Sequence, residues 1–153
     1  MVKIKVDDEI IHSPIRAKIR LDYQAEGKQR SFLFGGKNIE RLAEETREQK
    51  VAMLRNIPIQ GITIEDVDVS LGVYNVFDEN TQIETTYAPV LITITSETFE
   101  DIVKFVMRSE FRKIEIIEPE NMIFSRFDVE RILFRINEEL HIFKRQFERK
   151  FKQ

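Results

Sequence analysis

Apolar and polar residues alternate strictly in two early segments of the chain. Residues 2–6 alternate Val or Ile with Lys, which predicts a short half-buried strand that ends at residues 7–9. Residues 15–23 place Ile, Ala, Leu and Tyr on one face and Arg, Lys and Asp on the other. They predict a longer strand with one solvated face, followed by a turn at residues 25–28 and a hairpin partner at 31–34.

The period changes to that of a helix over about residues 38–55, with Asn38 as its N-cap. Alternation returns over residues 61–77 and again over about 82–95, so two long strands are predicted, joined by a turn at 78–80. Pro89 interrupts the second of them. Because proline has no N–H group to donate, it predicts a bulge or an edge position there.

The remaining third of the chain predicts a helix capped by Ser96, a strand over 113–118 and a last helix. The last helix begins at Ser125 or Asp128 and continues to about Phe151. The order β-ββα-ββα-β-α predicts one α+β domain over residues 1–153, an antiparallel sheet with helices on one face. Residues 125–152 form a long amphipathic helix that is free to project to a partner.

This C-terminal helix contains the clearest interaction signal. Six apolar residues, here named the seam, are spaced 4, 3, 4, 3 and 4, the a/d rhythm of a coiled coil: Val129, Leu133, Ile136, Leu140, Phe143 and Phe147. One interpretation packs this helix entirely on its own sheet, and the other gives one side to a second copy. About 25 residues span roughly 37 Å, longer than a small sheet covers, which favours a subunit contact.

Composition limits the possible classes of protein. The 153 residues are 42% hydrophobic and 33% charged, an ordinary globular balance. There is no cysteine, which excludes disulfides, thiolate catalysis and cysteine-based zinc sites. The sequence contains neither a signal-peptide pattern nor a membrane-spanning apolar run, so a cytoplasmic protein is predicted.

Charge is distributed unevenly along the chain. The 48 residues between Arg55 and Lys104 contain nine acidic residues and no basic one, while the other 105 hold 24 basic and 18 acidic residues. The net charge of −3 is therefore −9 in one block and +6 elsewhere. Such a division can orient copies of the same chain, with the acidic strands as the surface complementary to the last helix.

The end of the last helix is basic, and this leaves nucleic-acid binding as an alternative function. The basic side chains there are Lys144, Arg145, Arg149 and Lys150, interleaved with phenylalanines that can stack on bases or lie on an anionic membrane. Cations also stabilise any helix C-terminus. The chain pI of about 5.6 argues against a dedicated nucleic-acid protein.

Two small groups of residues are candidate ligand sites. Gly35, Gly36 and Lys37 lie between a strand and a helix N-terminus, where an anion can bind, although the full phosphate-loop pattern is absent. Asp66, Asp68 and Glu84 offer oxygen ligands for a divalent cation, or are solvated carboxylates. The two histidines form no triad arrangement, so we expect no catalytic residue, cofactor or metal.

These observations favour a non-catalytic, homo-oligomeric interaction or assembly module whose partner is a second copy of the chain. Nucleic-acid binding through the basic helix end is the first alternative. A small enzyme or ligand-binding domain, with a pocket between sheet and helices, is the second.

Overall fold

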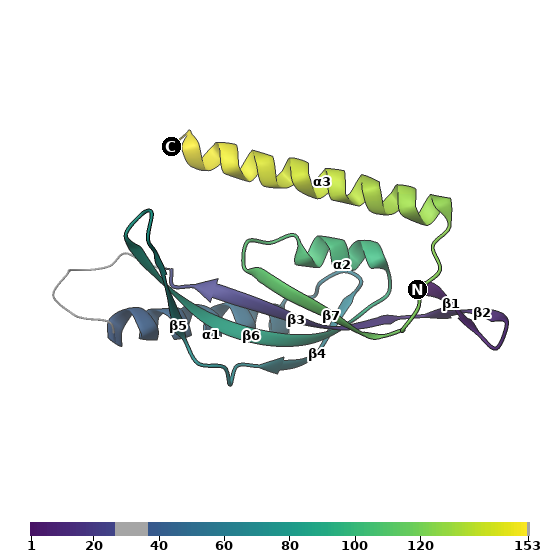
Figure 1. Ribbon diagram of the computed structural model, residues 1–153, viewed down its shortest axis with the longest axis horizontal. Coiled ribbons are helices and arrows are strands. Elements are labelled where there is room, and N and C mark those ends of the chain that lie inside the picture. The colour runs from purple at the N-terminus through teal and green to yellow at the C-terminus, as the bar shows by residue number, and fades with distance from the viewer. Residues whose placement is uncertain (27–36, 153) are drawn as a thin grey trace.

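Two long antiparallel strands, β3 (Ile15–Gln24) and β6 (Ile83–Ser96), form the centre of the structure. The structure is a computed structural model that describes residues 1–26 and 37–152. β4 (Ile62–Asp68) and β5 (Tyr74–Asp78) both pair with β6, and β7 (Phe111–Glu118) pairs with the other side of β3, all antiparallel. Figure 1 shows the resulting sheet, with the order β4-β6-β3-β7 and β5 following β4 along β6. The predicted α+β fold class is confirmed.

The predicted long strand over residues 61–77 is wrong, because it is divided into β4 and β5. Both halves pair with β6, β4 as far as Leu91 and β5 from Tyr87, so Pro89 lies between them. Arg47 fills this gap, with its Nη1 donating to the carbonyls of Leu71 at 2.8 Å and Pro89 at 3.1 Å. Proline needs no acceptor for an N–H group there, which explains how an interior strand tolerates it.

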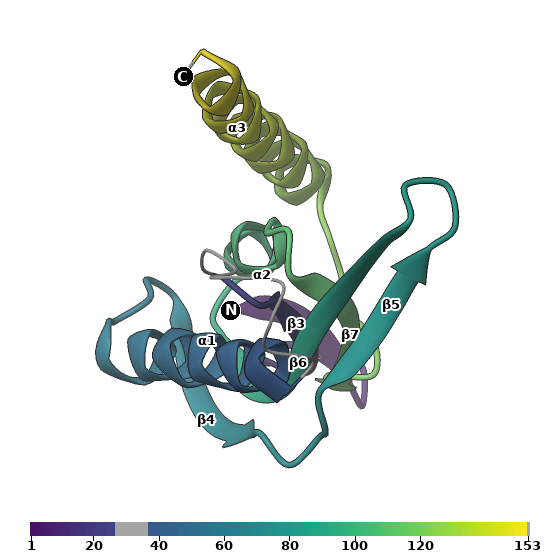
Figure 2. The same cartoon turned by 90° about the vertical axis from the view of Figure 1, so that its left-hand side faces the viewer.

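Helices α1 (Lys37–Asn56) and α2 (Phe99–Val106) cover the same face of the sheet (Figure 2). Val51 of α1 and Phe105 of α2 join one core with the odd-numbered residues of β3, including Ile19 and Leu21, which are fully buried. The alternation over residues 15–23 therefore predicted the buried face correctly. The even-numbered residues of β3 lie on the opposite, solvent-facing side.

Residues 7–13 differ from the prediction. They continue into a second strand, so that β1 (Val2–Val6) and β2 (Glu9–Ser13) form a separate two-stranded hairpin. Asp7 and Asp8 turn the chain with positive φ angles of 47° and 68°. The adjacent Ile10 and Ile11 are both exposed, and this lack of alternation explains why the strand was missed.

The start of α2 corrects another prediction. Its N-cap is Thr98, whose hydroxyl accepts from the backbone N–H of Asp101, and Ser96 instead donates to the Thr98 carbonyl. Gly61 precedes β4 with a φ of +73°, and a Cβ at this position would lie 2.1 Å from the Asp101 carboxylate. The helix predicted at about 38–55 is confirmed as α1, while the hairpin partner predicted at 31–34 lies outside the described residues.

The last helix, α3 (Arg126–Phe151), lies across α2 on the side away from the sheet (Figures 1 and 2). Its long axis extends well past α2, and in both views its C-terminal half is separate from the rest of the protein. No helix in the described ranges 1–26 and 37–152 is both long and apolar enough to cross a membrane.

Candidate assembly interface

Of the two predicted starting residues, Ser125 is the N-cap of α3, and Asp128 lies in the first turn, where the two form a complete capping box. The Ser125 hydroxyl accepts from the Asp128 N–H at 3.2 Å, and the Asp128 carboxylate accepts from the Ser125 N–H at 2.7 Å. The backbone hydrogen bond from Ser125 lowers the pKa of Asp128 below its ordinary value. The charged carboxylate is thus favoured at the positive end of the helix dipole.

An ion pair ties the first turns of α3 to α2. Arg131 lies 3.2 Å from the carboxylate of Glu100 in the first turn of α2, and it also pairs with Asp128 of its own helix. Ile132 and Ile136 are half-buried on this side, and Glu139 is only 8% exposed. These residues define the side of α3 that the rest of the chain supports.

The support ends half-way along α3. An eight-residue helix such as α2 is about 12 Å long, whereas the 26 residues of α3 extend about 39 Å. From Leu140 to Lys152 every residue is exposed. A helical segment with so little tertiary packing is only marginally stable in water, so the last three turns of α3 lack the contacts that normally maintain a helix.

The seam is exposed along almost its whole length. Five of its six side chains are between 44% and 60% exposed, and only Ile136 is half-buried. At 100° per residue, the seam residues and Phe151 fall within a contiguous arc of about 80°. Leu140 is turned about 100° away from Glu139, the residue that faces α2. The seam therefore forms an apolar stripe on the flank of α3 that the described residues leave uncovered.

The basic side chains of the α3 C-terminus are all exposed, and the helix distributes them around its circumference. By the same angular spacing, Lys144 and Lys150 lie on the two sides of the seam. Arg145 and Arg149 lie on the side of α3 opposite the seam, here named the far flank. A strand of nucleic acid follows a groove or stripe of positive charge. This arrangement instead places charges at the borders of an apolar surface.

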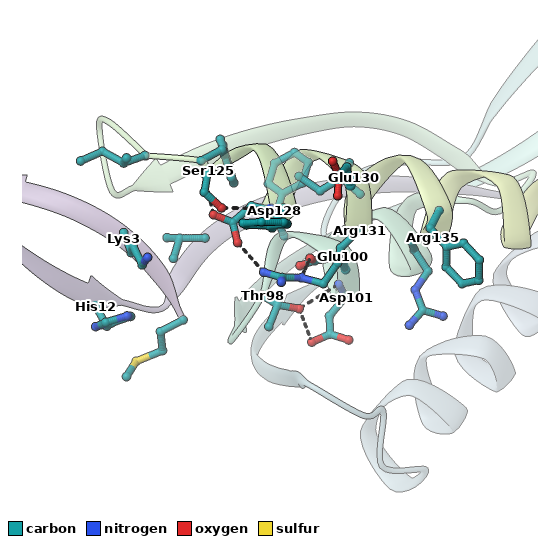
Figure 3. A pocket seen from close by; sticks show the side chains of 18 of the residues that line it. Lys3, His12, Thr98, Glu100, Asp101, Ser125, Asp128, Glu130, Arg131 and Arg135 are labelled. Atoms are coloured by element: carbon teal, nitrogen blue, oxygen red, sulfur yellow. Dashed lines mark hydrogen bonds and ion pairs between the residues drawn. The ribbon is translucent and has the colours of Figure 1, made fainter.

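A groove of about 1160 Å³ opens on the far flank of α3, between its first turns, the N-terminus of α2 and the β1–β2 hairpin (Figure 3). Its walls combine apolar groups such as Phe99 and Phe127 with polar ones. Figure 3 shows some of the polar groups paired with one another: Arg131 with Glu100 and Asp128, and the Thr98 hydroxyl donating to Asp101 at 2.7 Å. The hydroxyls of Thr98 and Ser125 cap α2 and α3 by accepting hydrogen bonds from backbone N–H groups, so their role is to stabilise the helix ends.

The acidic candidates do not converge. On β6, Asp68 of β4 pairs with Leu91, whereas Glu84 pairs with Phe77 of β5, seven residues away along the strand and thus roughly 23 Å distant. Asp68 and Glu84 are thus not placed together by the structure, which leaves the alternative that these acids are solvated carboxylates. Within residues 1–26 and 37–152, no three acidic or histidine side chains are grouped to hold a metal ion.

Several acids of the −9 block are used within the chain. Glu65 pairs with Arg16 at 2.7 Å, and hydrogen bonds from Thr95 and Arg16 lower the pKa of Glu65. Asp68 accepts from the Ser70 N–H at 2.8 Å and Asp78 from the Asn80 N–H at 2.8 Å. The acidic strands thus find partners on β3 and in their own turns, which weakens the expectation that they await α3 of another copy.

The anion candidate is only partly described. Gly35 and Gly36 lie outside the described residues, and Lys37 is described only as the first backbone position of α1. This prediction therefore stays a prediction.

Sequence reasoning missed a buried carboxylate on the solvent-facing side of the sheet. Asp22 is 3% exposed and accepts from the Tyr74 hydroxyl and from Arg20 Nε at 2.8 Å, with Arg112 Nε at 3.6 Å. Tyr87 stacks on Tyr74, with ring centroids 5.5 Å apart. No local pattern marks Asp22, because two of its three partners, Tyr74 and Arg112, come from β5 and β7, up to 90 residues away in sequence.

No protein-family model matches the chain, and no curated protein or solved structure matches it either.

Proposed function

We propose that the protein is a self-association module in which the seam of α3 binds the seam of a second copy. The single observation that supports this most strongly is the exposure of Val129, Leu133, Leu140, Phe143 and Phe147 along one flank of a helix that extends beyond its own domain. The seam spacing is that of helices which bury a and d residues against another helix.

The seam and Phe151 together form an apolar patch that, when it is fully buried, reaches the smallest area of specific dimer interfaces. With about 200 Å² for a fully exposed aromatic side chain, the exposed fractions of the seam residues and Phe151 correspond to an apolar patch on the order of 600 Å² per copy. Monomeric proteins seldom expose larger patches unless these are functional. Two such patches buried against each other reach roughly 1,200 Å², the lower bound of standard specific interfaces.

The exposed half of α3 also needs a partner for its own stability. Residues 140–152 contain three phenylalanines, all more than half exposed, and the rings of Phe147 and Phe151 lie against each other, with centroids 4.6 Å apart. A second α3 would supply the tertiary contacts that this segment lacks. The structure offers no comparable reason for a nucleic-acid partner, because the cations there do not form one stripe.

Light scattering coupled to size exclusion tests this function. The wild-type protein is expected at twice the chain mass at micromolar concentration, and Leu140→Asp is expected at the chain mass, since it places a charge in the middle of the seam. Phe134→Asp is the matched control. Phe134 is 65% exposed but lies on the far flank of α3, so its variant is expected to remain a dimer. A wild-type monomer at several hundred micromolar would refute the proposal.

A further inference from the structure

The distribution of side-chain size along the seam gives it a direction. Its N-terminal half is aliphatic, with Val129, Leu133 and Ile136, whereas Phe143 and Phe147 occupy the C-terminal half. In a parallel pair of helices, each seam residue faces the same residue of the other copy. The C-terminal layers then contain only phenylalanines, and the first layer contains only two valines. In an antiparallel pair the layers combine Val129 with Phe147, Leu133 with Phe143, and Ile136 with Leu140. Each layer then holds a similar volume, as close packing requires.

Charge along α3 favours the same direction. Residues 140–152 contain five basic side chains and one acidic one, a net charge of +4, while residues 126–139 contain three basic and four acidic ones, a net charge of −1. Parallel pairing would place +4 beside +4. Antiparallel pairing places each basic half beside the slightly acidic half of the other copy, which lowers the repulsion.

The residues at the border of the seam specify the register. On the border of the seam opposite Glu139 lie Glu130, Asn137 and Lys144, each seven residues from the next, at heptad position e; Glu130 also lines the groove beside the N-terminus of α2. With the three layers above, antiparallel symmetry places Glu130 of each copy beside Lys144 of the other copy. It places the Asn137 residues of the two copies beside each other. Positions beside the seam are where charge pairs set partner choice and orientation in coiled coils.

In a parallel pair this contact cannot form. Glu130 and Lys144 are 14 residues apart, about 21 Å along the helix, so in that orientation neither reaches the other. On the opposite border, antiparallel symmetry brings the two copies of Glu139 nearest to each other. Each Glu139 is 8% exposed within its own chain, where it lines a small pocket together with Lys104 of α2 rather than the seam.

We propose that two copies of the chain associate through antiparallel α3 helices about a two-fold axis near Asn137, with two equivalent Glu130–Lys144 contacts between the copies. This inference rests on the self-association proposed above and adds to it the orientation, register and charge pairs of the interface. The first half of each α3 packs on α2 of its own protomer. In an antiparallel pair, the sheet and helices α1 and α2 of the two protomers therefore lie at opposite ends of the helix pair.

Charge reversal with full-length protein tests the orientation. Glu130→Lys and Lys144→Glu are each expected to weaken the dimer about tenfold, because each creates two like-charge contacts per dimer. The double variant is expected to recover the wild-type Kd within about threefold. Glu138→Lys is the control, because it reverses a charge on the far flank of α3, away from the Glu130–Lys144 contact. Sedimentation equilibrium measures each Kd.

Mixing the two single variants gives a second, independent readout. A tagged Glu130→Lys chain and an untagged Lys144→Glu chain are expected to co-purify as a heterodimer, since both contacts between them then join opposite charges. A wild-type dimer that shows no effect of Glu130→Lys and no preferred heterodimer would overturn the antiparallel register and leave self-association standing. A wild-type monomer would overturn both.

Discussion

Truncation of one phenylalanine in the seam should separate dimer formation from folding. Phe143 is 56% exposed in the protomer, which corresponds to about 110 Å² of a side chain that exposes roughly 200 Å² in full. At about 25 cal/mol per Å², burying this area contributes up to about 3 kcal/mol, of which Ala would retain a part. Phe143→Ala is therefore expected to cost about 2 kcal/mol per copy and about 4 kcal/mol per dimer. The dimer Kd should increase about 10³-fold.

The same substitution should hardly change the folding of the monomer, because Phe143 contributes little to the protomer's own core. Urea denaturation at a concentration below the dimer Kd is expected to give a free energy of unfolding within about 0.5 kcal/mol of wild type. Phe134→Ala is the matched control: the same residue type on the same helix, 65% exposed, and outside the seam. The reasoning fails if Phe134→Ala and Phe143→Ala weaken the dimer equally, or if neither changes the Kd by more than threefold.

Three further predictions concern the protomer. Glu139→Leu is expected to stabilise the monomer by about 1 kcal/mol in urea denaturation. Glu139 Oε1 is buried without a hydrogen-bond partner among the described residues, and a leucine removes the cost of burying it. Destabilisation would indicate that the carboxylate has a stabilising partner. Gly61→Ala is expected to cost about 1–2 kcal/mol in thermal denaturation, because of its φ of +73° and the contact with Asp101, while Gly72→Ala, whose Cβ would have no atom within 4 Å, should cost less than 0.5 kcal/mol. Burial raises the pKa of Tyr23 to about 12, so its contribution to stability is complete below about pH 10, the ordinary tyrosine value, and is lost as the pH rises from there toward 12. Between pH 9 and pH 11.5, wild type is thus expected to lose about 2 kcal/mol more than Tyr23→Phe in urea titrations, and equal losses would contradict this assignment.

Pro89 predicted an interruption in its own strand, but no local pattern predicted that residues 61–77 divide into β4 and β5 opposite it. Residues 61–77 alternate well enough to predict one strand, and residues 82–95 predict another. At the break between β4 and β5, Arg47, from a helix more than 20 residues earlier, donates to the carbonyls of Leu71 and Pro89. A contact between such distant residues leaves no trace in the local period.

The acidic block illustrates a similar limit. Its position along the chain was evident, but its partners were not. Arg16 reaches Glu65 because β4 and β3 both lie against β6, an arrangement that strand order determines and local sequence does not. Charges far apart in sequence therefore compensate each other within one protomer.

By itself, the sequence determined the α+β class, the buried face of β3, the range of α3 and the spacing of its seam, because all of these follow from the local periods of helix and strand. Only the tertiary structure decided which side of α3 stays uncovered. That depended on the length of α2, which covers only about 12 Å of a 39 Å helix, and on the rotation that turns Glu139 rather than Leu140 toward it. A heptad pattern specifies which residues can be buried together, whereas the surface that remains exposed depends on where every other element lies.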